Sequence, residues 1–217
     1  MAAFDLEEQE QISQIKGWWE QFGTLVTGVA VAAAIASVGW QGWQWYQGKQ
    51  SAEASALYGV LQKAASERNT QKAREAAGTL LEKYNGTAYA DMAALLSAKV
   101  QAEAGDLKNA RVPLAWAASN ASDPALRELA RLRLATVMFD DKAYDEALAQ
   151  LQAPTDESLV ARFADLKGDI LLAQGKREEA RAAYKAVVTA LETTTKSESA
   201  ALREIAQAKL DAVGGAQ

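Results

Sequence analysis

No charged side chain occurs between Gln21 and Gly48, and few folds can accommodate such a stretch. A helix rises about 1.5 Å per residue, so roughly twenty of these residues reach across the hydrocarbon core of a bilayer. A helix in a soluble core would normally keep a polar stripe toward water, but the centre of this stretch offers only apolar, small and hydroxyl side chains. The stretch therefore predicts a membrane-spanning helix over residues 22–46.

Aromatic residues flank the stretch on both sides. Amphipathic rings favour the two headgroup interfaces of a membrane, so a pair of aromatic clusters fits a span better than it fits a buried core helix, which is the first alternative. The flanking aromatic residues are Trp18, Trp19, Phe22, Trp40, Trp43, Trp45 and Tyr46.

A cleaved signal peptide is the second alternative. The small residues at 34–36, followed by Ser37, resemble a cleavage site. A signal peptide begins with a basic region, whereas residues 1–20 carry five acidic side chains and one lysine, a net charge of −4. We therefore expect an uncleaved anchor that follows a short acidic tail over residues 1–21.

The remaining composition excludes several classes of function. The chain carries a net charge of −5, and because −4 of it lies in residues 1–20, residues 21–217 carry only −1. Binding of nucleic acid needs a concentrated basic surface, which this balance does not supply. The absence of cysteine excludes disulfides and thiolate chemistry, and the absence of histidine removes the commonest general base and metal ligand. One lysine lies near each end of the predicted span, so the positive-inside rule does not predict which end faces the cytoplasm.

Three segments after the anchor share one spacing. Each has a small residue, a tight turn seven residues later, a second small residue five beyond the turn, and a bulky apolar residue four further on. In that order the three sets are Ala98, Gly105, Ala110 and Leu114; Ala135, Lys142, Ala147 and Leu151; Gly168, Gly175, Ala180 and Tyr184. The first small residues lie 37 and 33 residues apart, close to the tetratricopeptide period of about 34.

This periodicity predicts an all-α chain, with a single N-terminal transmembrane helix followed by a tetratricopeptide-like helical-repeat solenoid over residues 47–217. Residues 54–84 are expected to form a degenerate additional helix pair, and residues 201–213 a C-terminal capping helix. An alanine-rich helical bundle that imitates the repeats by chance is the alternative. Small side chains let the two helices of a pair approach closely, and we assign that role to Ala98, Ala110, Ala135, Ala147, Gly168 and Ala180.

The order of parts resembles the ancillary SecYEG translocon subunit family over nearly the whole chain. The resemblance rests on "IKGWWEQFG" (15–23), "GWQGWQWYQ" (39–47), "FADLKGDILLAQGKREEARAAY" (163–184) and "LREIAQAKLDAV" (202–213). It implies a cytoplasmic tail, one span in the bacterial inner membrane and a periplasmic repeat domain. It also implies association with the Sec translocon and with a membrane-anchored periplasmic chaperone of the peptidyl-prolyl isomerase type. The family supplies no catalytic motif.

The inner wall of the solenoid, formed by the first helix of each pair, is the expected partner-binding surface. Helical phase places there Lys99, Thr136, Phe139, Arg162, Asp165 and Asp169, together with the apolar Met92, Leu129 and Leu172. The alternative is that the apolar members fill the core and that Arg162, Asp165 and Asp169 pair along their own helix.

Catalytic patterns are weak throughout. Five residues instead of four separate Gly42 from Gly48, and Gln50 stands where a phosphate loop needs Ser or Thr. Ser97 and Lys99 lie two apart on one helix and face different directions. We therefore expect no enzyme, cofactor, metal or small-molecule substrate. The family resemblance then implies a membrane-anchored adaptor of the translocon that assists translocated or outer-envelope-bound proteins. The alternatives are a periplasmic client-holding repeat protein that works independently of the translocon, and a membrane-bound hydrolase.

Overall fold

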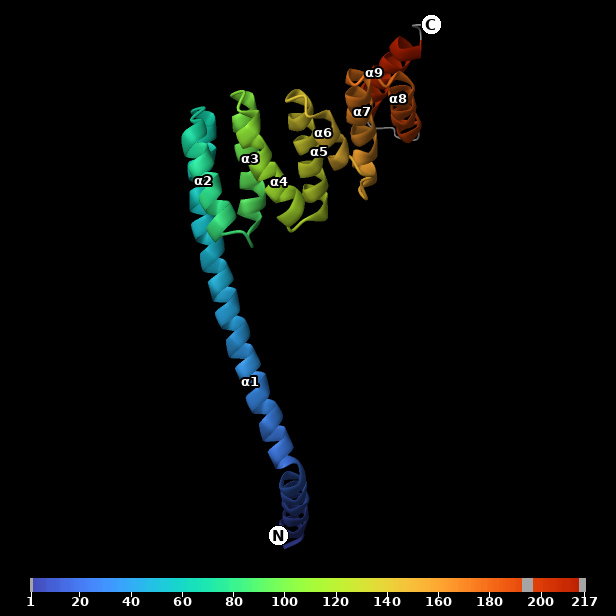
Figure 1. Ribbon diagram of the computed structural model, residues 1–217. Helices are drawn as coiled ribbons and strands as arrows, with labels where there is room; N and C mark the ends of the chain where they lie inside the picture. Colours follow the sequence, from blue (N-terminus) through green and yellow to red (C-terminus); the bar gives the residue numbers. More distant parts are fainter. Residues whose placement is uncertain (1, 193–196, 215–217) are drawn as a thin grey trace. The chain divides into compact units, whose positions relative to one another are not determined.

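The computed structural model describes residues 2–192 and 197–214, and within these residues it contains helices and no strand. The helices are α1 (Ala2–Ser66), α2 (Thr70–Lys83), α3 (Ala88–Glu103), α4 (Leu107–Asn120), α5 (Pro124–Asp140), α6 (Tyr144–Gln150), α7 (Glu157–Ala173), α8 (Arg177–Leu191) and α9 (Ser197–Gly214) (Figure 1). The all-α prediction is confirmed. The last residues of the predicted repeat domain, 215–217, lie outside the described part of the chain.

The chain divides into two compact units, Met1–Gln50 and Ser51–Gln217. Within the described residues, one helix is long and apolar enough to cross a membrane, and its most apolar window has a mean hydropathy of 1.9. Only 6% of that window is buried, and the flanking aromatic side chains are exposed, so this segment is not the core helix of the second unit. The predicted N-terminal candidate membrane helix is thereby confirmed.

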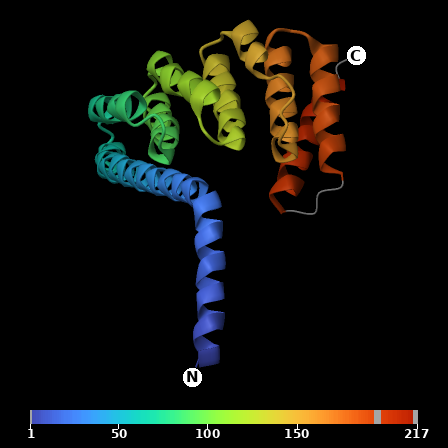
Figure 2. The same cartoon turned by 90° about the horizontal axis from the view of Figure 1, so that it is seen from below.

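The second unit is built from consecutive helix pairs, which follow one another in the order of the sequence (Figures 1 and 2). Residues 51–66 of α1 pair with α2 through a cluster that contains Leu61 and Leu80. The other pairs are α3 with α4, α5 with α6, and α7 with α8. The predicted segment 54–84 thus forms a helix pair of its own.

All four pairs turn in the same way. A residue with positive φ ends the first helix of each pair: Arg68 (54°), Gly105 (78°), Lys142 (60°) and Gly175 (78°). The next residue donates its N–H to the carbonyl five residues back, as Asp106 does to Gln101 at 2.9 Å, which closes the helix end. Arg68 therefore marks the turn of the first pair, a position that the spacing of the other three did not reveal.

Side-chain sizes across each pair are complementary. The positions seven residues before and nine residues after each turn hold Leu61 with Ala77, Ala98 with Leu114, Ala135 with Leu151, and Gly168 with Tyr184. The Gly168–Tyr184 pair has the largest difference in size. The ring of Tyr184 lies so close that a Cβ on Gly168 would be 2.5 Å from Tyr184 Cε1. The six small residues assigned to helix packing are all buried.

Helix α9 lies on the α7–α8 pair as α5 lies on the α3–α4 pair. Three apolar residues of α9 pack against the buried residues of α7 and α8: Ala206, Leu210 and Val213. The corresponding residues of α5 pack against α3 and α4: Ala130, Leu134 and Val137. Helix α9 is therefore the first helix of a further repeat and covers the end of the apolar core, as expected of a capping helix.

The connection between α6 and α7, residues 151–156, is longer than the turns within the helix pairs. Helix α6 ends at Gln150, well before the proline that disfavours helix at residue 153. The side chain of Arg131 donates to the carbonyls of Gln150 and Gln152 at 2.9 Å each. The buried Glu128 carboxylate accepts hydrogen bonds from both N–H and Oγ1 of Thr155, each at 2.7 Å. Two side chains of α5 thus hold in place a connection that has neither helix nor strand.

Glu128 should make the stability of this connection depend on pH. The hydrogen bonds from Thr155, then the N–H of Asp156, hold the pKa of Glu128 below its ordinary 4.5. A lowered pKa in the folded state stabilises the fold at pH values above 4.5, and this contribution is lost as the pH falls through the folded value. We expect Glu128→Gln to lower the free energy of unfolding by about 1–2 kcal/mol at pH 7, because the charged hydrogen bonds are lost.

Urea unfolding of the parent and the Glu128→Gln variant from pH 7 to pH 3 measures this effect. The difference between them should shrink as the pH falls, because the parent carboxylate becomes neutral there. A difference that stays constant down to pH 3 would contradict the assignment.

Candidate partner-binding groove

A groove of about 230 Å³ runs between α3 and α5, the first helices of two neighbouring pairs. We call it the α3–α5 groove. Helices α3, α4 and α5 line it with Leu95, Ala98, Lys99, Ala102, Leu114, Arg133, Thr136, Val137 and Asp140. It lies wholly within the repeat unit and on the surface that the sequence assigned to partner binding.

The groove has an apolar floor and charged edges. Leu114, only 1% exposed, closes the floor from α4. Lys99 Nζ lies 3.7 Å from Glu103 Oε1, but both side chains are about two-thirds exposed, so this pair contributes little. Thr136 donates its hydroxyl to the carbonyl of Leu132 at 3.0 Å. Such a surface can hold apolar side chains of a polypeptide and contact its charged groups.

Two of the predicted inner-wall residues, Lys99 and Thr136, line the groove. Phe139 does not, because its ring packs against the α5–α6–α7 core at 5.9 Å from the ring of Tyr144. Arg162 is exposed on α7 and has no hydrogen-bond or ion-pair partner among the side chains that the structure describes. Of the apolar candidates, Met92 and Leu172 are 38% exposed and Leu129 is half-buried.

Asp165 and Asp169 are engaged within the domain. Lys209 Nζ of α9 lies 2.8 Å from Asp165 Oδ1 and 2.7 Å from Asp169 Oδ1. Tyr184 donates its hydroxyl to Asp169 Oδ1 at 2.8 Å. The capping helix, and not Arg162 of their own helix, therefore supplies the cation for both carboxylates, and a role of Asp165 and Asp169 toward a partner stays a prediction. We call this group the α7–α9 ion cluster.

Burial and the interactions with Asp165 and Asp169 both shift the pKa values in the α7–α9 ion cluster. Burial alone would lower the pKa of Lys209, but the hydrogen bonds and charges of Asp165 and Asp169 outweigh it, so that pKa is raised. Burial and the hydrogen bond to Asp169 raise the pKa of Tyr184. Lysine and tyrosine therefore both keep their protons at neutral pH, and the cluster stays assembled.

Two groove residues, Arg133 and Asp140, are not among the predicted inner-wall residues. Both share a helix face with Leu129 and Thr136, since the four residues follow one another at intervals of four, three and four. These intervals along α5 were therefore sufficient to place Arg133 and Asp140 on the predicted inner-wall face.

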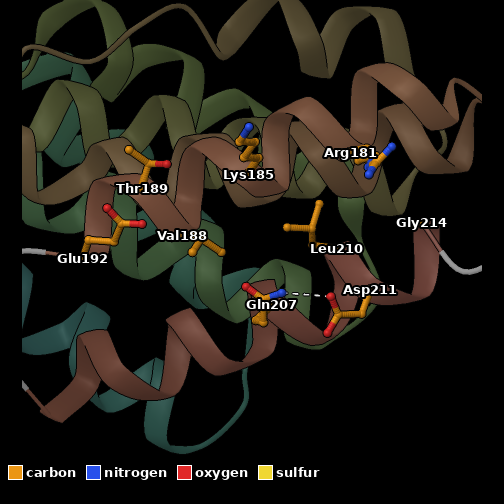
Figure 3. A pocket seen from close by; sticks show the side chains of 9 residues that line it. All are labelled: Arg181, Lys185, Val188, Thr189, Glu192, Gln207, Leu210, Asp211 and Gly214. Carbon is orange, nitrogen blue, oxygen red and sulfur yellow. Dashed lines mark hydrogen bonds between the residues drawn. The ribbon is translucent and has the colours of Figure 1, made fainter.

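A second hollow, of about 570 Å³, lies between α8 and α9 (Figure 3). Arg181 and Lys185 line it from α8, and Gln207 donates to Asp211 at 2.8 Å on the α9 side. In the packing of α9, Asp211 stands where α5 has Ala135, the small residue that faces its own second helix. A polar pair at this position suits the solvent-facing end of a repeat array.

Comparison with known proteins supports the repeat assignment. The family model described as a tetratricopeptide repeat-like domain matches residues 16–215. The protein named "Ancillary SecYEG translocon subunit" of Haemophilus influenzae is 31% identical over 183 residues, which is 84% of this chain and 89% of that protein. This chain belongs to the ancillary SecYEG translocon subunit family.

Other members of the family match along different lengths. The protein of the same name from Neisseria gonorrhoeae is 28% identical over 212 residues, 97% of this chain and 99% of its own length. The Escherichia coli protein of that name is 33% identical over 114 residues, 52% of this chain and 55% of its own length. The likeness to the family therefore includes the candidate membrane helix as well as the repeats.

Proposed function

We propose that the protein is a non-enzymatic, membrane-anchored adaptor of the Sec translocon. One observation carries the proposal: a chain of this family joins a candidate membrane helix to a helical-repeat unit with an open groove on its first helices. The anchor restricts the repeat unit to the membrane surface, where a translocon works. The groove supplies a surface for protein contacts.

The polar side chains of α3 favour binding over catalysis. The hydroxyl of Ser97 is buried and accepts a hydrogen bond from Gln101 at 3.0 Å, whereas Lys99 points to Glu103. The two groups therefore do not form a dyad. Among the residues whose side chains are described, no group of three or more acidic residues could hold a metal ion.

The proposal extends to topology and partners. Residues 1–21 would lie in the cytoplasm and the repeat unit in the periplasm of a bacterial inner membrane. There the repeat unit would link the translocon to a membrane-anchored chaperone of the peptidyl-prolyl isomerase type and assist translocated proteins. The family resemblance supports this arrangement, and the acidic tail is compatible with it because acidic residues weigh little in orienting a span.

Co-isolation tests the translocon link. We expect the tagged 217-residue chain to retrieve SecYEG from mild-detergent extracts, and Arg162→Ala to melt like the parent but retrieve less chaperone. An unrelated single-span protein at equal abundance is the control. Retrieval of SecYEG no better than this control would refute the adaptor role.

Because the chain has no cysteine, labelling of Lys108→Cys with a membrane-impermeant maleimide tests the orientation separately.

A further inference from the structure

The junctions between neighbouring pairs can be compared position by position. Gly105 and Gly175 are equivalent turns, so Leu95 and Lys99 of α3 correspond to Asp165 and Asp169 of α7. Leu134 and Leu210 are equivalent in packing, so the preceding residues, Arg133 of α5 and Lys209 of α9, also correspond. Each of these two junctions, α3–α5 and α7–α9, therefore places one cation of the following helix opposite the same two positions of the preceding helix.

The cation of the following helix has different surroundings at the two junctions. At the α7–α9 junction, Lys209 bridges the carboxylates of Asp165 and Asp169 at 2.8 and 2.7 Å. At the α3–α5 junction, Leu95 and Lys99 stand in place of these carboxylates, and Arg133 lines the same groove. Arg133 is exposed and has no ion-pair partner among the side chains that the structure describes. The α3–α5 groove is thus a junction whose cation lacks the carboxylates that its counterpart has.

We propose that the α3–α5 groove binds an acidic polypeptide segment, with a carboxylate between Lys99 and Arg133 and a neighbouring aliphatic side chain on the apolar floor. Charge complementarity selects this occupant, because two cations border a cavity floored by Leu95, Leu114 and Val137. A guanidinium binds a carboxylate through two parallel hydrogen bonds, which makes Arg133 the stronger contact. This inference rests on the adaptor function proposed above and names the chemistry of the segment that the adaptor holds.

Acidic residues of the chain itself determine where in the groove the acidic residue of the segment can bind. Glu103 contacts Lys99 only through an exposed pair at 3.7 Å, which a better-placed carboxylate can replace. Asp140, the last residue of α5, lines the groove at the end where α3 contributes Ala102. A carboxylate would be repelled there. The acidic residue of the segment therefore binds at the Lys99–Arg133 position and not at the Asp140 end.

The first experiment uses the full chain in detergent micelles and two short peptides, acetylated and amidated. One alternates Leu with Glu and the other alternates Leu with Gln. We expect the Glu peptide to bind about tenfold more tightly, as one charge-assisted contact allows, and to weaken with added salt. Equal affinity of the two peptides, or binding of neither, would overturn the proposal. Binding only by a Leu–Gln peptide with a free C-terminal carboxylate would also overturn it.

Three variants test whether the Glu peptide binds in the α3–α5 groove. Arg133→Gln and Lys99→Asp should each abolish the preference for the Glu peptide. In Lys99→Asp the new carboxylate stands where α7 has Asp169, so it can occupy Arg133 internally. Lys108→Gln removes an exposed lysine of α4 outside the groove and should bind like the parent. Circular dichroism checks that all three remain folded. A preference for Glu that survives Arg133→Gln and Lys99→Asp would place binding elsewhere and refute the assignment.

The peptide result and the co-isolation result separate the two proposals. Retrieval of SecYEG together with equal binding of both peptides would refute the groove assignment alone. A preference for the Glu peptide without retrieval of SecYEG would refute the translocon adaptor and leave the groove as an acidic-segment site.

Discussion

Gly168→Ala should lower the free energy of unfolding by about 2–3 kcal/mol, a large loss for a single added methyl group. The new Cβ would lie 2.5 Å from Cε1 and 2.7 Å from Cδ1 of the Tyr184 ring. Tyr184 is fully buried, so its ring has no free space into which it can turn. Urea unfolding of the full chain, followed by circular dichroism, measures the loss. The matched control is Gly78→Ala in α2, where a Cβ meets nothing within 4 Å and should stabilise slightly.

A second substitution should rescue the first. Ala98 with Leu114, and Ala135 with Leu151, occupy the same two positions in other pairs, so Gly168→Ala should be tolerated with Tyr184→Leu. We expect the double variant to be more stable than the sum of the single losses predicts, by about 1–2 kcal/mol. Additive losses would show that the two positions do not compensate each other.

Lys209→Met should lower the free energy of unfolding by about 2–3 kcal/mol. It leaves Asp165 and Asp169 without their cation at side chains only 19% and 30% exposed, although partial access to water keeps the loss below that of a fully buried pair. Because each repeat contacts mainly its neighbours, hydrogen exchange should accelerate in α9 and α8 before it does in α2 and α3.

The control for this prediction is Lys185→Met. Lys185 is an exposed lysine of α8 that takes no part in the α7–α9 ion cluster, and its replacement should change stability by no more than about 0.5 kcal/mol. If Lys209→Met melts like Lys185→Met, with unchanged protection of α9, then the cluster does not hold the capping helix.

Local spacing was sufficient to predict most of the fold. The sets around Gly105, Lys142 and Gly175 are short-range patterns, and the structure gives all three turn residues a positive φ. The first pair was harder to align because it reverses the sizes, with Leu61 where the others have a small residue and Ala77 where they have a large one. A search for fixed residue types overlooks such an exchange, although the summed volume of the two positions is preserved.

The site was less predictable because its charges are satisfied across repeats. Asp165 and Asp169 share a helix face with Arg162, but their cation lies 44 and 40 residues further along the chain. Only the placement of α9 on the α7–α8 pair brings Lys209 to them. Helical phase places Phe139 on the inner wall. Its ring instead packs against Tyr144, beyond the turn, and against the core of α5, α6 and α7. Helical phase locates a face and does not determine what covers it.

The equivalent packing of α9 and α5 bears on how such proteins can grow. A duplicated helix pair inserted ahead of α9 would find, at its two ends, surfaces that already accept it, since Ala206, Leu210 and Val213 repeat the contacts of Ala130, Leu134 and Val137. The gene can therefore lengthen or shorten its array by whole modules while the anchor and the terminal helix stay unchanged. The length of the repeat array thus becomes a quantity that evolution, or a designer, can adjust in steps of one repeat.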